Sequence, residues 1–424
     1  MNLVRRLALT AALCALPFAV AHAAPPPAEV FFKDPEVREA VLSPTGRRLA
    51  MTTSKGMPRV GLVVFDLAPG GRIVRLHQFP DGDVINVRWV NDERLVFGMS
   101  DLVDGSGLRS GAPGLFTVKV DGSRYRQLVR RQWKVAISDE QLREVTALDW
   151  HHRLIAIPPS QPGKVNEEVL MMEFPPGEGD DTSLVWLNTA NNTTRHVDHR
   201  PLSNVTGWLT DPHGQPRVAY TRDKDRVTAH WIPPGGSTWA RLYESALFDP
   251  PFRVQAVDAQ GSLLVSRRQG EQGYDVLSRY DAERRAPQDK PLVATPGFDF
   301  DGDLLFDDGK TLGLRLNVDG EMTVWFDPAM KAFQERADAL FPGRINRVDC
   351  RRCGTPEMVA LVRSYSDREP GQLYVFEAKP PEGQKNWRLI QSVRPAVKAQ
   401  QMSTLELHRV PARDGLNLPV WVTR

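Results

Sequence analysis

The chain has 424 residues, with 54 lysine and arginine residues against 52 aspartate and glutamate residues, so its formal net charge is +2. Charges of both signs are interspersed along the sequence, which gives no electrostatic case for nucleic acid or an anionic membrane as a partner. Because the length exceeds that of a usual domain of about 150 residues, the chain needs either several domains or one repeat architecture.

Residues 1–23 have the features of a cleavable export signal. Arg5 and Arg6 form a basic start, residues 7–21 form an apolar run, and residues 21–23 (AHA) are a small-x-small cleavage site. Removal of this segment takes away both arginines and no acidic residue, so the formal net charge falls from +2 to 0. No later stretch reaches the roughly 20 apolar residues of a membrane span. We therefore expect a periplasmic or secreted protein without a membrane anchor, in which residues 24–37 lead into the first folded unit.

A polar turn followed by an apolar strand recurs along most of the remaining chain. Its copies are spaced by about 50 residues, which is typical of repeat architectures. The turns and strands are residues 43–46 before 49–51, 89–93 before 95–97, 150–152 before 154–157, 211–214 before 218–220, 258–261 before 263–265, 307–309 before 312–314, and 350–354 before 359–361.

Further strand-like segments follow most of these copies. They are rich in β-branched and aromatic residues and have Gly, Asp or Asn at their ends, as half-buried strands do. These segments are residues 61–66, 114–122, 183–188, 274–280 and 372–376. About four strands in each repeat of this length indicate a β-propeller, whose radial closure leaves few exposed edges. We predict an all-β fold, a propeller of about seven four-stranded blades over residues 38–395.

Two segments between the strands have helical signals. Asp327 supplies an N-cap and Pro328 a first-turn proline. The apolar residues that then recur on one face are Met330, Phe333, Ala337 and Leu340. A shorter candidate begins at Ser138, with Gln141 in the capping-box position. We expect both helices to pack on blade edges, because amphipathic spacing is mainly a burial signal.

Residues 396–424 are predicted to leave the propeller. Residues 405–424 alternate apolar and polar side chains around Asp414 and Gly415, which is typical of a β-hairpin. A single hairpin cannot form a core of its own. We therefore interpret this region as a linker and the truncated start of a second domain.

Six segments carry a resemblance to a known family. They are residues 31–32 (FF), 42–50 (LSPTGRRLA), 116–123 (FTVKVDGS), 341–347 (FPGRINR), 362–371 (VRSYSDREPG) and 412–423 (ARDGLNLPVWVT). In this order they resemble the N-terminal propeller of the prolyl oligopeptidase family of serine peptidases, in particular its exported bacterial dipeptidyl- or acylaminoacyl-peptidase-like members. The resemblance covers essentially the whole mature chain, and the last three segments are its most specific part.

The resemblance implies a non-catalytic portion of an exported serine peptidase. Family members continue from such an Arg-Asp-Gly hairpin into an α/β-hydrolase domain that holds the catalytic serine, aspartate and histidine. By resemblance, the propeller would cap that domain in cis, admit and bind short peptides, and be inactive alone. The alternative is a free-standing periplasmic propeller that binds a protein or another ligand. Such a binder should end near Val393, whereas this chain continues for residues 394–424.

A hydrolase serine of this kind needs a G-x-S-x-G turn, because small neighbours allow the sharp strand-to-helix bend that exposes the hydroxyl. The sequence has no such pentad. Ser237 has Gly235 two positions before it but Trp239 two positions after it. We therefore predict no catalytic residue within the chain. An enzyme with chemistry borne by the propeller itself is a third reading, for which no carboxylate or histidine constellation is recognisable.

Histidine pairs are weak candidates for metal ligands. His196 and His199 form His-x-x-His, and His151 and His152 are adjacent. Neither pair has a carboxylate at a recognisable metal spacing, so we expect solvated turn histidines.

Two further patterns are incomplete. Aspartates begin a calcium-loop pattern at Asp299, Asp301 and Asp303. Leu304 and Lys310 occupy the positions at which that loop needs a Gly and a Glu. Residues 309–311 (GKT) end like a phosphate loop, but Leu304 again stands where its first glycine belongs.

Paired acids and paired cysteines complete the candidates. Glu167 and Glu168 resemble the glutamates that bind the substrate amino terminus in dipeptidyl peptidases, but their surroundings are typical of a turn entering a strand, so we expect solvated acids. Cys350 and Cys353, which remain after processing, are expected as a small disulfide or as two thiols in a structural role, because a zinc site would need two more ligands. We predict no metal ion and no cofactor.

Overall fold

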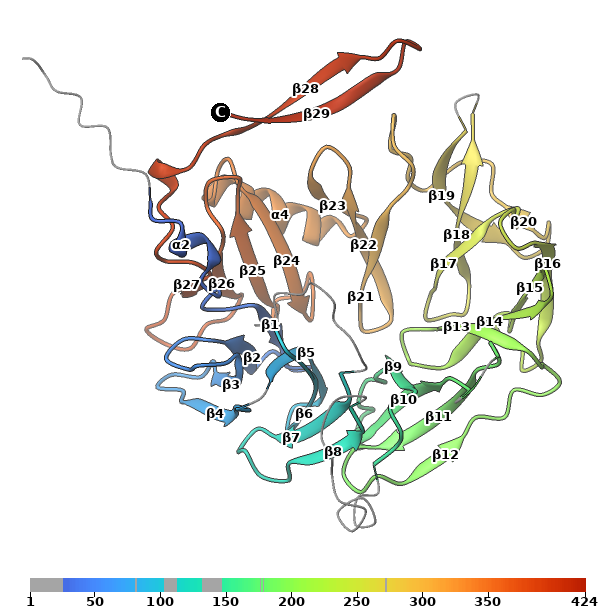
Figure 1. Cartoon of the computed structure of the whole chain (residues 1–424), viewed down its shortest axis with the longest axis horizontal. Helices are drawn as coiled ribbons and strands as arrows, with labels where there is room; N and C mark the ends of the chain where they lie inside the picture. Colours follow the sequence, from blue (N-terminus) through green and yellow to red (C-terminus); the bar gives the residue numbers. More distant parts are fainter. Residues whose placement is uncertain are drawn as a thin grey trace, which may run out of the picture.

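A computed structural model of the chain shows a ring of blades (Figure 1). It describes residues 26–80, 82–102, 113–131, 147–175, 177, 179–270 and 273–424. Within these ranges, seven antiparallel sheets follow one another around the ring, and a two-stranded hairpin follows them. The prediction of an all-β propeller with a C-terminal hairpin is confirmed. The predicted signal segment 1–23 and the candidate helix at Ser138 lie outside the described residues.

Each blade is a meander of consecutive strands whose first strand lies nearest the centre of the ring (Figure 1). Blades 1 and 2 contain β1 (Glu39–Leu42), β2 (Arg48–Thr53), β3 (Gly61–Asp66) and β4 (Ile73–His77), then β5 (Asp83–Asn91), β6 (Arg94–Ser100), β7 (Leu115–Lys119) and β8 (Arg126–Val129). Blades 3 and 4 contain β9 (His152–Ala156), β10 (Glu168–Glu173), β11 (Ser183–Asn188) and β12 (Thr194–His196), then β13 (Val205–Thr210), β14 (Pro216–Asp223), β15 (Arg226–Trp231) and β16 (Ala240–Ala246). Blades 5 to 7 contain β17 (Arg253–Val257), β18 (Leu263–Gln269), β19 (Tyr274–Asp281) and β20 (Ala286–Pro287), then β21 (Gly302–Asp307), β22 (Lys310–Asn317) and β23 (Glu321–Trp325), and finally β24 (Ile345–Arg351), β25 (Val359–Tyr365), β26 (Gln372–Glu377) and β27 (Trp387–Ser392).

Blade 6 departs from the four-stranded prediction, because its sheet has three strands in the described part of the chain. The helix α4 (Pro328–Leu340) follows β23 and packs against both β23 and β24. Asp327 caps this helix by accepting hydrogen bonds from the backbone amides of Ala329 (3.0 Å) and Met330 (3.1 Å). The predicted helix is therefore confirmed, and it occupies the sequence between the third strand of blade 6 and the first strand of blade 7.

One residue of the predicted apolar face of α4 is misplaced. Met330, Phe333 and Ala337 are buried as expected, but Leu340 is 50% exposed. Leu340 lies in the final turn, and the neighbouring Phe341 takes the packing position instead, with its ring 4.3 Å from that of Tyr374. The expectation of burial for Leu340 is therefore wrong, because helical spacing alone does not say where the underlying core ends.

The repeated turns owe their shape to an aspartate and a glycine. In blade 4, the Asp211 carboxylate accepts hydrogen bonds from two backbone amides of its own turn (3.0 Å each). In blade 5, the Asp258 carboxylate does the same (3.0 and 2.8 Å). Gly214 and Gly261 follow at the equivalent position with φ values of 77° and 89°. An L-residue there would be strained, which explains the recurring Asp-x-x-Gly pattern.

The hydrophobic core consists of a cluster between each pair of neighbouring blades. In β6, Leu95 and Phe97 face the cluster between blades 1 and 2, while Val96 faces the cluster between blades 2 and 3. The same alternation occurs in β25, where Leu361 faces blade 1 and Val362 faces α4 and blade 6. A strand that is buried on both faces appears in the sequence as a continuous apolar run. The second strand of most blades can therefore be recognised from the sequence.

Blade 3 is offset from the repeat seen in the sequence. In the other six blades the predicted apolar core falls on the second strand of the blade, but residues 154–157 fall on its first strand, β9. The second strand, β10, begins only at Glu168, after a connection that contains three prolines, Pro158, Pro159 and Pro162. Proline has no backbone N–H and cannot donate a hydrogen bond to a neighbouring strand. These residues therefore do not extend β9 or β10, and the connection between the two strands is longer than a simple turn.

The ring closes between blade 7 and blade 1 without an exchanged strand among the described residues. Val37, Leu42 and Leu361 belong to the apolar cluster at this junction. Arg351 of β24 donates hydrogen bonds to the carbonyls of Leu42 (2.8 Å) and Ser43 (3.1 Å) in blade 1. Side-chain contacts and a backbone hydrogen bond from the Glu36 amide to the Val393 carbonyl (2.8 Å), rather than a shared sheet, therefore hold the two ends of the ring together.

The C-terminal hairpin consists of β28 (Leu405–Pro411) and β29 (Asn417–Thr423) and lies at the edge of the ring, outside the seven sheets (Figure 1). A linker that contains the short helix η1 (Ala399–Gln401) leads into it. At the other end of the chain, the short helix α2 (Glu29–Phe32) lies beside this linker, where Arg394 donates a hydrogen bond to the Phe31 carbonyl (3.2 Å). No helix in the described ranges is both long and apolar enough to cross a membrane.

Candidate functional site

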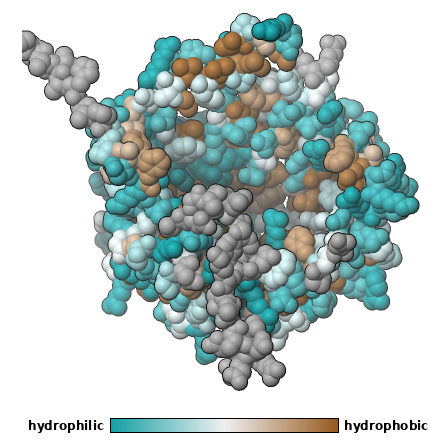
Figure 2. Space-filling view, in the orientation of Figure 1, coloured by the Kyte–Doolittle hydropathy of each residue, from teal (hydrophilic) through white to brown (hydrophobic). Residues whose placement is uncertain are grey.

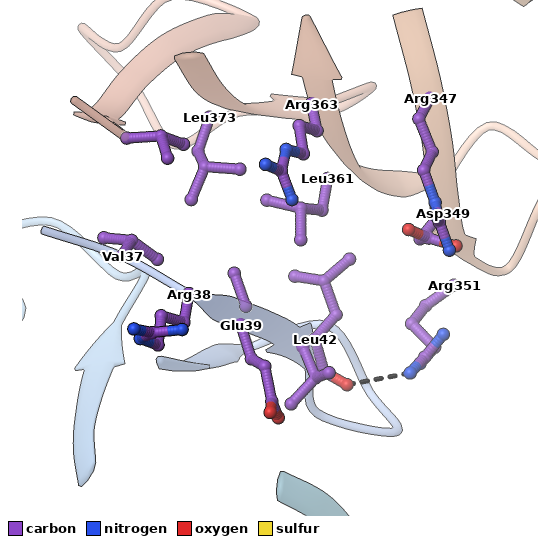
Figure 3. A pocket seen from close by; sticks show the side chains of 13 residues that line it. Val37, Arg38, Glu39, Leu42, Arg347, Asp349, Arg351, Leu361, Arg363 and Leu373 are labelled. Carbon is purple, nitrogen blue, oxygen red and sulfur yellow. Dashed lines mark hydrogen bonds between the residues drawn. The ribbon is translucent and has the colours of Figure 1, made fainter. Parts of the chain in front are cut away.

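A cavity of about 380 Å³ lies at the junction of blades 7 and 1 (Figure 3). Apolar side chains from both blades line part of its wall: Val37, Leu42, Leu361, Leu373 and Val393. Charged side chains line the rest: Arg38, Glu39, Arg347, Asp349, Arg351 and Arg363. The cavity therefore combines four guanidinium groups with two carboxylates beside an apolar surface.

Two arginines face each other across neighbouring strands in this cavity. Arg347 of β24 is directly opposite Arg363 of β25 in the antiparallel register. Like charges that are directly opposite on paired strands destabilise a sheet. Arg347 has a distant partner in Glu321 (3.6 Å), whereas no carboxylate in the described residues lies within 4 Å of the Arg363 guanidinium. Arg363 points into the cavity above Leu361 (Figure 3).

The other charged groups of the cavity are committed to the fold. The Glu39 carboxylate accepts hydrogen bonds from the backbone amides of Asn86 (2.8 Å) and Val87 (2.9 Å). Asp349 pairs with the buried Arg315 (3.2 Å). Burial lowers the pKa of Arg351, and the charge of Asp307 opposes that shift. Arg38 pairs with Asp34. Arg363, whose guanidinium lies 5.9 Å from the centroid of the Tyr365 ring, is therefore the charged group of the cavity that is open to an anionic ligand, with Arg347 beside it.

This arrangement suits a ligand with an anionic group and an apolar part. A guanidinium binds carboxylates through paired N–H donors in a fixed fork. A carboxylate placed between Arg347 and Arg363 would relieve their mutual repulsion, while Leu361 and Leu373 would contact the rest of the ligand. Short peptides carry both features at their C-terminus.

The absence of a catalytic residue within the chain stays a prediction, and the hydroxyl contacts below concern the described residues alone. In the described part of the chain, no serine hydroxyl is hydrogen-bonded to a histidine, and the hydroxyl–imidazole contact that does occur joins Thr221 and His230 (2.9 Å). Ser237 lies in the connection between β15 and β16. A nucleophile–base–carboxylate chain is not assembled among these residues.

The two histidine pairs differ in their surroundings. His196 is exposed in β12, and His199 packs edge-on against Trp208, so this pair forms no joint site. His151 and His152 behave differently, because their side chains are only 12% and 6% exposed and the Glu173 carboxylate lies 3.7 Å from each. The expectation that these two are solvated and lack a carboxylate is wrong. The pairing of β9 with β10 places Glu173 opposite His152, a proximity that residue spacing cannot show.

Glu167 and Glu168 are separated by their ion pairs. Glu167 binds Arg94 of blade 2 at 2.7 Å, and Glu168, the first residue of β10, lies 3.2 Å from Arg195. The predicted turn entering a strand is confirmed. Two carboxylates that are engaged with different arginines do not form the joint amino-terminus site of dipeptidyl peptidases.

The calcium-loop and phosphate-loop patterns are parts of blade turns and strands. Asp299 accepts a hydrogen bond from the Asp275 amide (2.9 Å), and Asp303 lies within β21. Gly309 lies in the tight turn between β21 and β22, and Lys310 and Thr311 begin β22, beside a second cavity of about 400 Å³. Lys310 is paired with the Asp327 carboxylate (2.5 Å), so it is not presented to a phosphate group.

Cys350 and Cys353 are joined in a disulfide at the end of β24. This settles the alternative that the sequence left open in favour of the disulfide. The bonded cysteines contribute to the cluster between blades 6 and 7.

Sequence reasoning missed the cavity arginines. Arg347 and Arg363 lie in segments that carried the family resemblance, yet no ligand role was assigned to them. A signal was available in β24, where Arg347, Asp349 and Arg351 recur with the period of two that places them on one face of a strand. Their position opposite blade 1 depends on ring closure, which the local sequence does not encode.

The fold and the cavity define a β-propeller with a charged pocket at its closing junction. No protein-family model matches the sequence, and none of the curated proteins matches it. Solved structures do match in fold, and the fold is that of the propeller of prolyl oligopeptidases.

Two of these structures show the extent of the likeness. One comes from a structural and mechanistic analysis of two prolyl endopeptidases, with a TM-score of 0.51 and 14% identity over 92% of this chain and 54% of that chain. The other is prolyl oligopeptidase B from Galerina marginata bound to a 35mer hydrolysis and macrocyclization substrate, with a TM-score of 0.51 and 10% identity over 92% of this chain and 55% of that chain. This chain therefore spans about half the length of the solved proteins that it matches.

Proposed function

We propose that this chain is the propeller domain of an exported serine peptidase of the prolyl oligopeptidase type, and that it admits and binds short peptides for a hydrolase domain. The observation that carries the proposal is the cavity between blades 7 and 1, in which Arg363 has no carboxylate partner among the described residues. The peptide's terminal carboxylate binds between Arg347 and Arg363. The fold likeness supports the peptidase class by analogy, since fold alone does not determine function. The export signal of residues 1–23 supports a periplasmic or secreted location.

The hydrolase partner is proposed from apolar surface at the two ends of the described chain. On the hairpin, Leu416, Leu418 and Trp421 are 58%, 47% and 49% exposed, and on α2 Phe32 is 87% exposed. Figure 2 shows the hydrophobic colour of the hairpin at the rim of a face that is otherwise mainly hydrophilic. Exposed apolar groups of this kind mark interaction surfaces. The match spans only 54% and 55% of the two solved proteins, which supports a hydrolase domain of the same protein as the occupant.

Calorimetric titration with a short peptide tests peptide binding. A tetrapeptide with a free C-terminus should bind more tightly than the same peptide with an amidated C-terminus. We expect a difference of roughly tenfold or more in Kd, because a hydrogen bond to a charged group contributes about 1.5–3 kcal/mol. The Arg363→Gln variant should lose this preference, whereas Arg413→Gln, a matched change in the exposed hairpin turn, should keep it. Equal affinity for both peptides in the unaltered chain would refute the proposed carboxylate site.

The hydrolase partner has a separate test. The coding sequence beyond the Arg424 codon, read in all three frames, should contain a His-Gly-Gly segment and a G-x-S-x-G motif, which supply the oxyanion hole and the nucleophile of such domains. Their absence would favour the second candidate, a free-standing propeller that binds a protein or another ligand. That candidate is consistent with the complete set of seven inter-blade clusters, which the hairpin does not join.

A further inference from the structure

Blade 3 holds a cluster of two imidazoles and one carboxylate outside the cavity described above. Glu173 ends β10 and pairs with His152 at the start of β9, and His151 precedes that strand. The Nε2 atoms of His151 and His152 each lie 3.7 Å from Oε1 of Glu173. Among the described residues, this is the group of three potential metal ligands whose donor atoms all lie within 4.8 Å of one another.

Two hydrogen bonds prepare the cluster for a cation. His152 Nδ1 lies 3.0 Å from the Asp149 carbonyl oxygen. Because a carbonyl only accepts, Nδ1 carries the proton and Nε2 keeps its lone pair for Glu173 or a metal ion. Ser183 donates a hydrogen bond to Oε2 of Glu173 (2.7 Å), which leaves Oε1 directed at the imidazoles. Metal-ligating histidines and carboxylates are oriented by outer hydrogen bonds of this kind.

The backbone also fixes the three ligands relative to one another. The Phe174 amide donates a hydrogen bond to the His151 carbonyl (2.9 Å), which continues the β9–β10 pairing past Glu173. The side chains of His151 and His152 are nearly buried, and that of Glu173 is 30% exposed. The donor atoms are therefore held on paired strands rather than on long surface side chains.

We propose that His151, His152 and Glu173 bind a divalent transition-metal ion of the Zn²⁺ class. Two imidazole nitrogens and one carboxylate oxygen are a donor set that zinc accepts, and three protein ligands leave a fourth position open. Zinc bonds of about 2.0–2.1 Å in a tetrahedron place donor atoms about 3.3 Å apart. The two 3.7 Å separations between the imidazoles and Glu173 thus need to close by only a few tenths of an ångström, and all three donor atoms lie within 4.8 Å of one another. The proposal is independent of the proposed peptidase function.

Cobalt titration of the full chain, prepared without a histidine tag, tests the site. Co²⁺ in a tetrahedral site gives a visible absorption band that hexahydrated Co²⁺ lacks, and Zn²⁺ should displace it. We expect one equivalent of Co²⁺ per chain. The His152→Gln and Glu173→Gln variants should lose the band, while His196→Gln, in an exposed histidine of the same blade, should keep it. Far-UV circular dichroism of each variant separates loss of the site from loss of the fold.

Ser183 is a positioning residue in this account, and its variants refine the test. Ser183→Ala should weaken Co²⁺ binding by roughly tenfold, since loss of an outer hydrogen bond typically costs 10–100-fold in metal affinity. Ser183→Thr retains a hydroxyl and should restore most of it. Absence of a tetrahedral band from the unaltered chain, or a band that persists in both His152→Gln and Glu173→Gln, would overturn the proposal.

Discussion

The ring and the terminal hairpin contain similar apolar residues but bury them to different extents. Leu95 in β6 is fully buried between blades 1 and 2, whereas Leu418 in β29 is 47% exposed. In the ring, an apolar strand such as β6 packs against a neighbouring blade on each of its two faces. In the hairpin, each strand has one paired strand and a few polar contacts to the ring. Those contacts include the Arg409–Asp319 ion pair (2.5 Å), the Arg409 guanidinium over the Phe298 ring (5.6 Å) and the hydrogen bond from the Leu405 amide to Asp367 (2.8 Å). The difference predicts that the ring is stable by itself and that the hairpin contributes little to that stability.

A matched pair of leucine truncations tests this comparison with the largest expected effect. Leu95→Ala should lower the free energy of unfolding by about 2–5 kcal/mol, because it leaves a cavity in a packed core. Leu418→Ala should change that free energy by no more than about 0.5 kcal/mol, because the side chain is already 47% exposed and lies outside the clusters of the ring. Urea unfolding followed by tryptophan fluorescence measures both. Similar losses for the two variants would contradict the separation of ring and hairpin.

Substitution at the closing junction sharpens the account of the ring. Arg351→Met should lower the free energy of unfolding by about 1–3 kcal/mol, because the carbonyls of Leu42 and Ser43 lose their donor. The same change at Arg413, in the exposed hairpin turn, is the control and should have no measurable effect. An unchanged free energy of unfolding in Arg351→Met would show that apolar packing alone closes the ring.

The cap of α4 gives a smaller effect that depends on pH. A hydrogen bond from Lys310, and then the backbone amides of Met330 and Ala329, lower the pKa of Asp327 below its ordinary value of 3.8. A lowered folded-state pKa adds stability above the unfolded-state pKa, and this stability is lost as the pH falls through the folded-state value. Asp327→Ala should therefore cost about 1 kcal/mol at pH 7.

Unfolding of the Asp327→Ala variant and the unaltered chain should be compared from pH 7 down to the acid limit of the fold. The difference between them should shrink once the pH falls below about 3.8, where the Asp327 carboxyl of the unfolded chain is protonated. Lys310→Met is the partner control and should reproduce part of the effect. A difference that is the same at pH 7 and in acid would mean that the carboxylate charge of Asp327 does not contribute.

Release of the hairpin should have the smallest effect on global stability. Arg409→Ala removes the ion pair with Asp319, and exposed ion pairs contribute about 0.2–1 kcal/mol at most. We expect faster protease cleavage at the hairpin and an unchanged urea midpoint for the ring. A large shift of the midpoint would show that the hairpin supports the blades.

The sequence predicted those features of the fold that depend on local chemistry. The Asp-x-x-Gly turns of blades 4 and 5, the doubly buried second strands and the cap of α4 are all visible in short segments. In blade 3, the predicted apolar core fell on the first strand, β9, instead of the second. The reason is that the long proline-containing connection, residues 157–167, separates β9 from β10. The burial of Leu340 was overestimated because helical periodicity does not reveal where a core ends.

The candidate sites depended on contacts that sequence distance hides. Arg347 and Arg363 become a cavity pair through the register of β24 and β25 and through closure onto blade 1. His151 and His152 gain Glu173 through the pairing of β9 with β10. In both cases the residue types were visible in the sequence, but the partner was set by cross-strand register, which a single sequence does not specify.

Hydrogen exchange of the whole chain distinguishes a ring that unfolds as one cooperative unit from a hairpin that stays outside that unit. Backbone amides of β2, β6 and β25 should exchange at the slow rate set by global unfolding, and those of β28 and β29 should exchange orders of magnitude faster, because an isolated hairpin is only marginally stable in water. Equal protection of the hairpin and the blades would contradict the account, since the hairpin would then belong to the cooperative core of the ring.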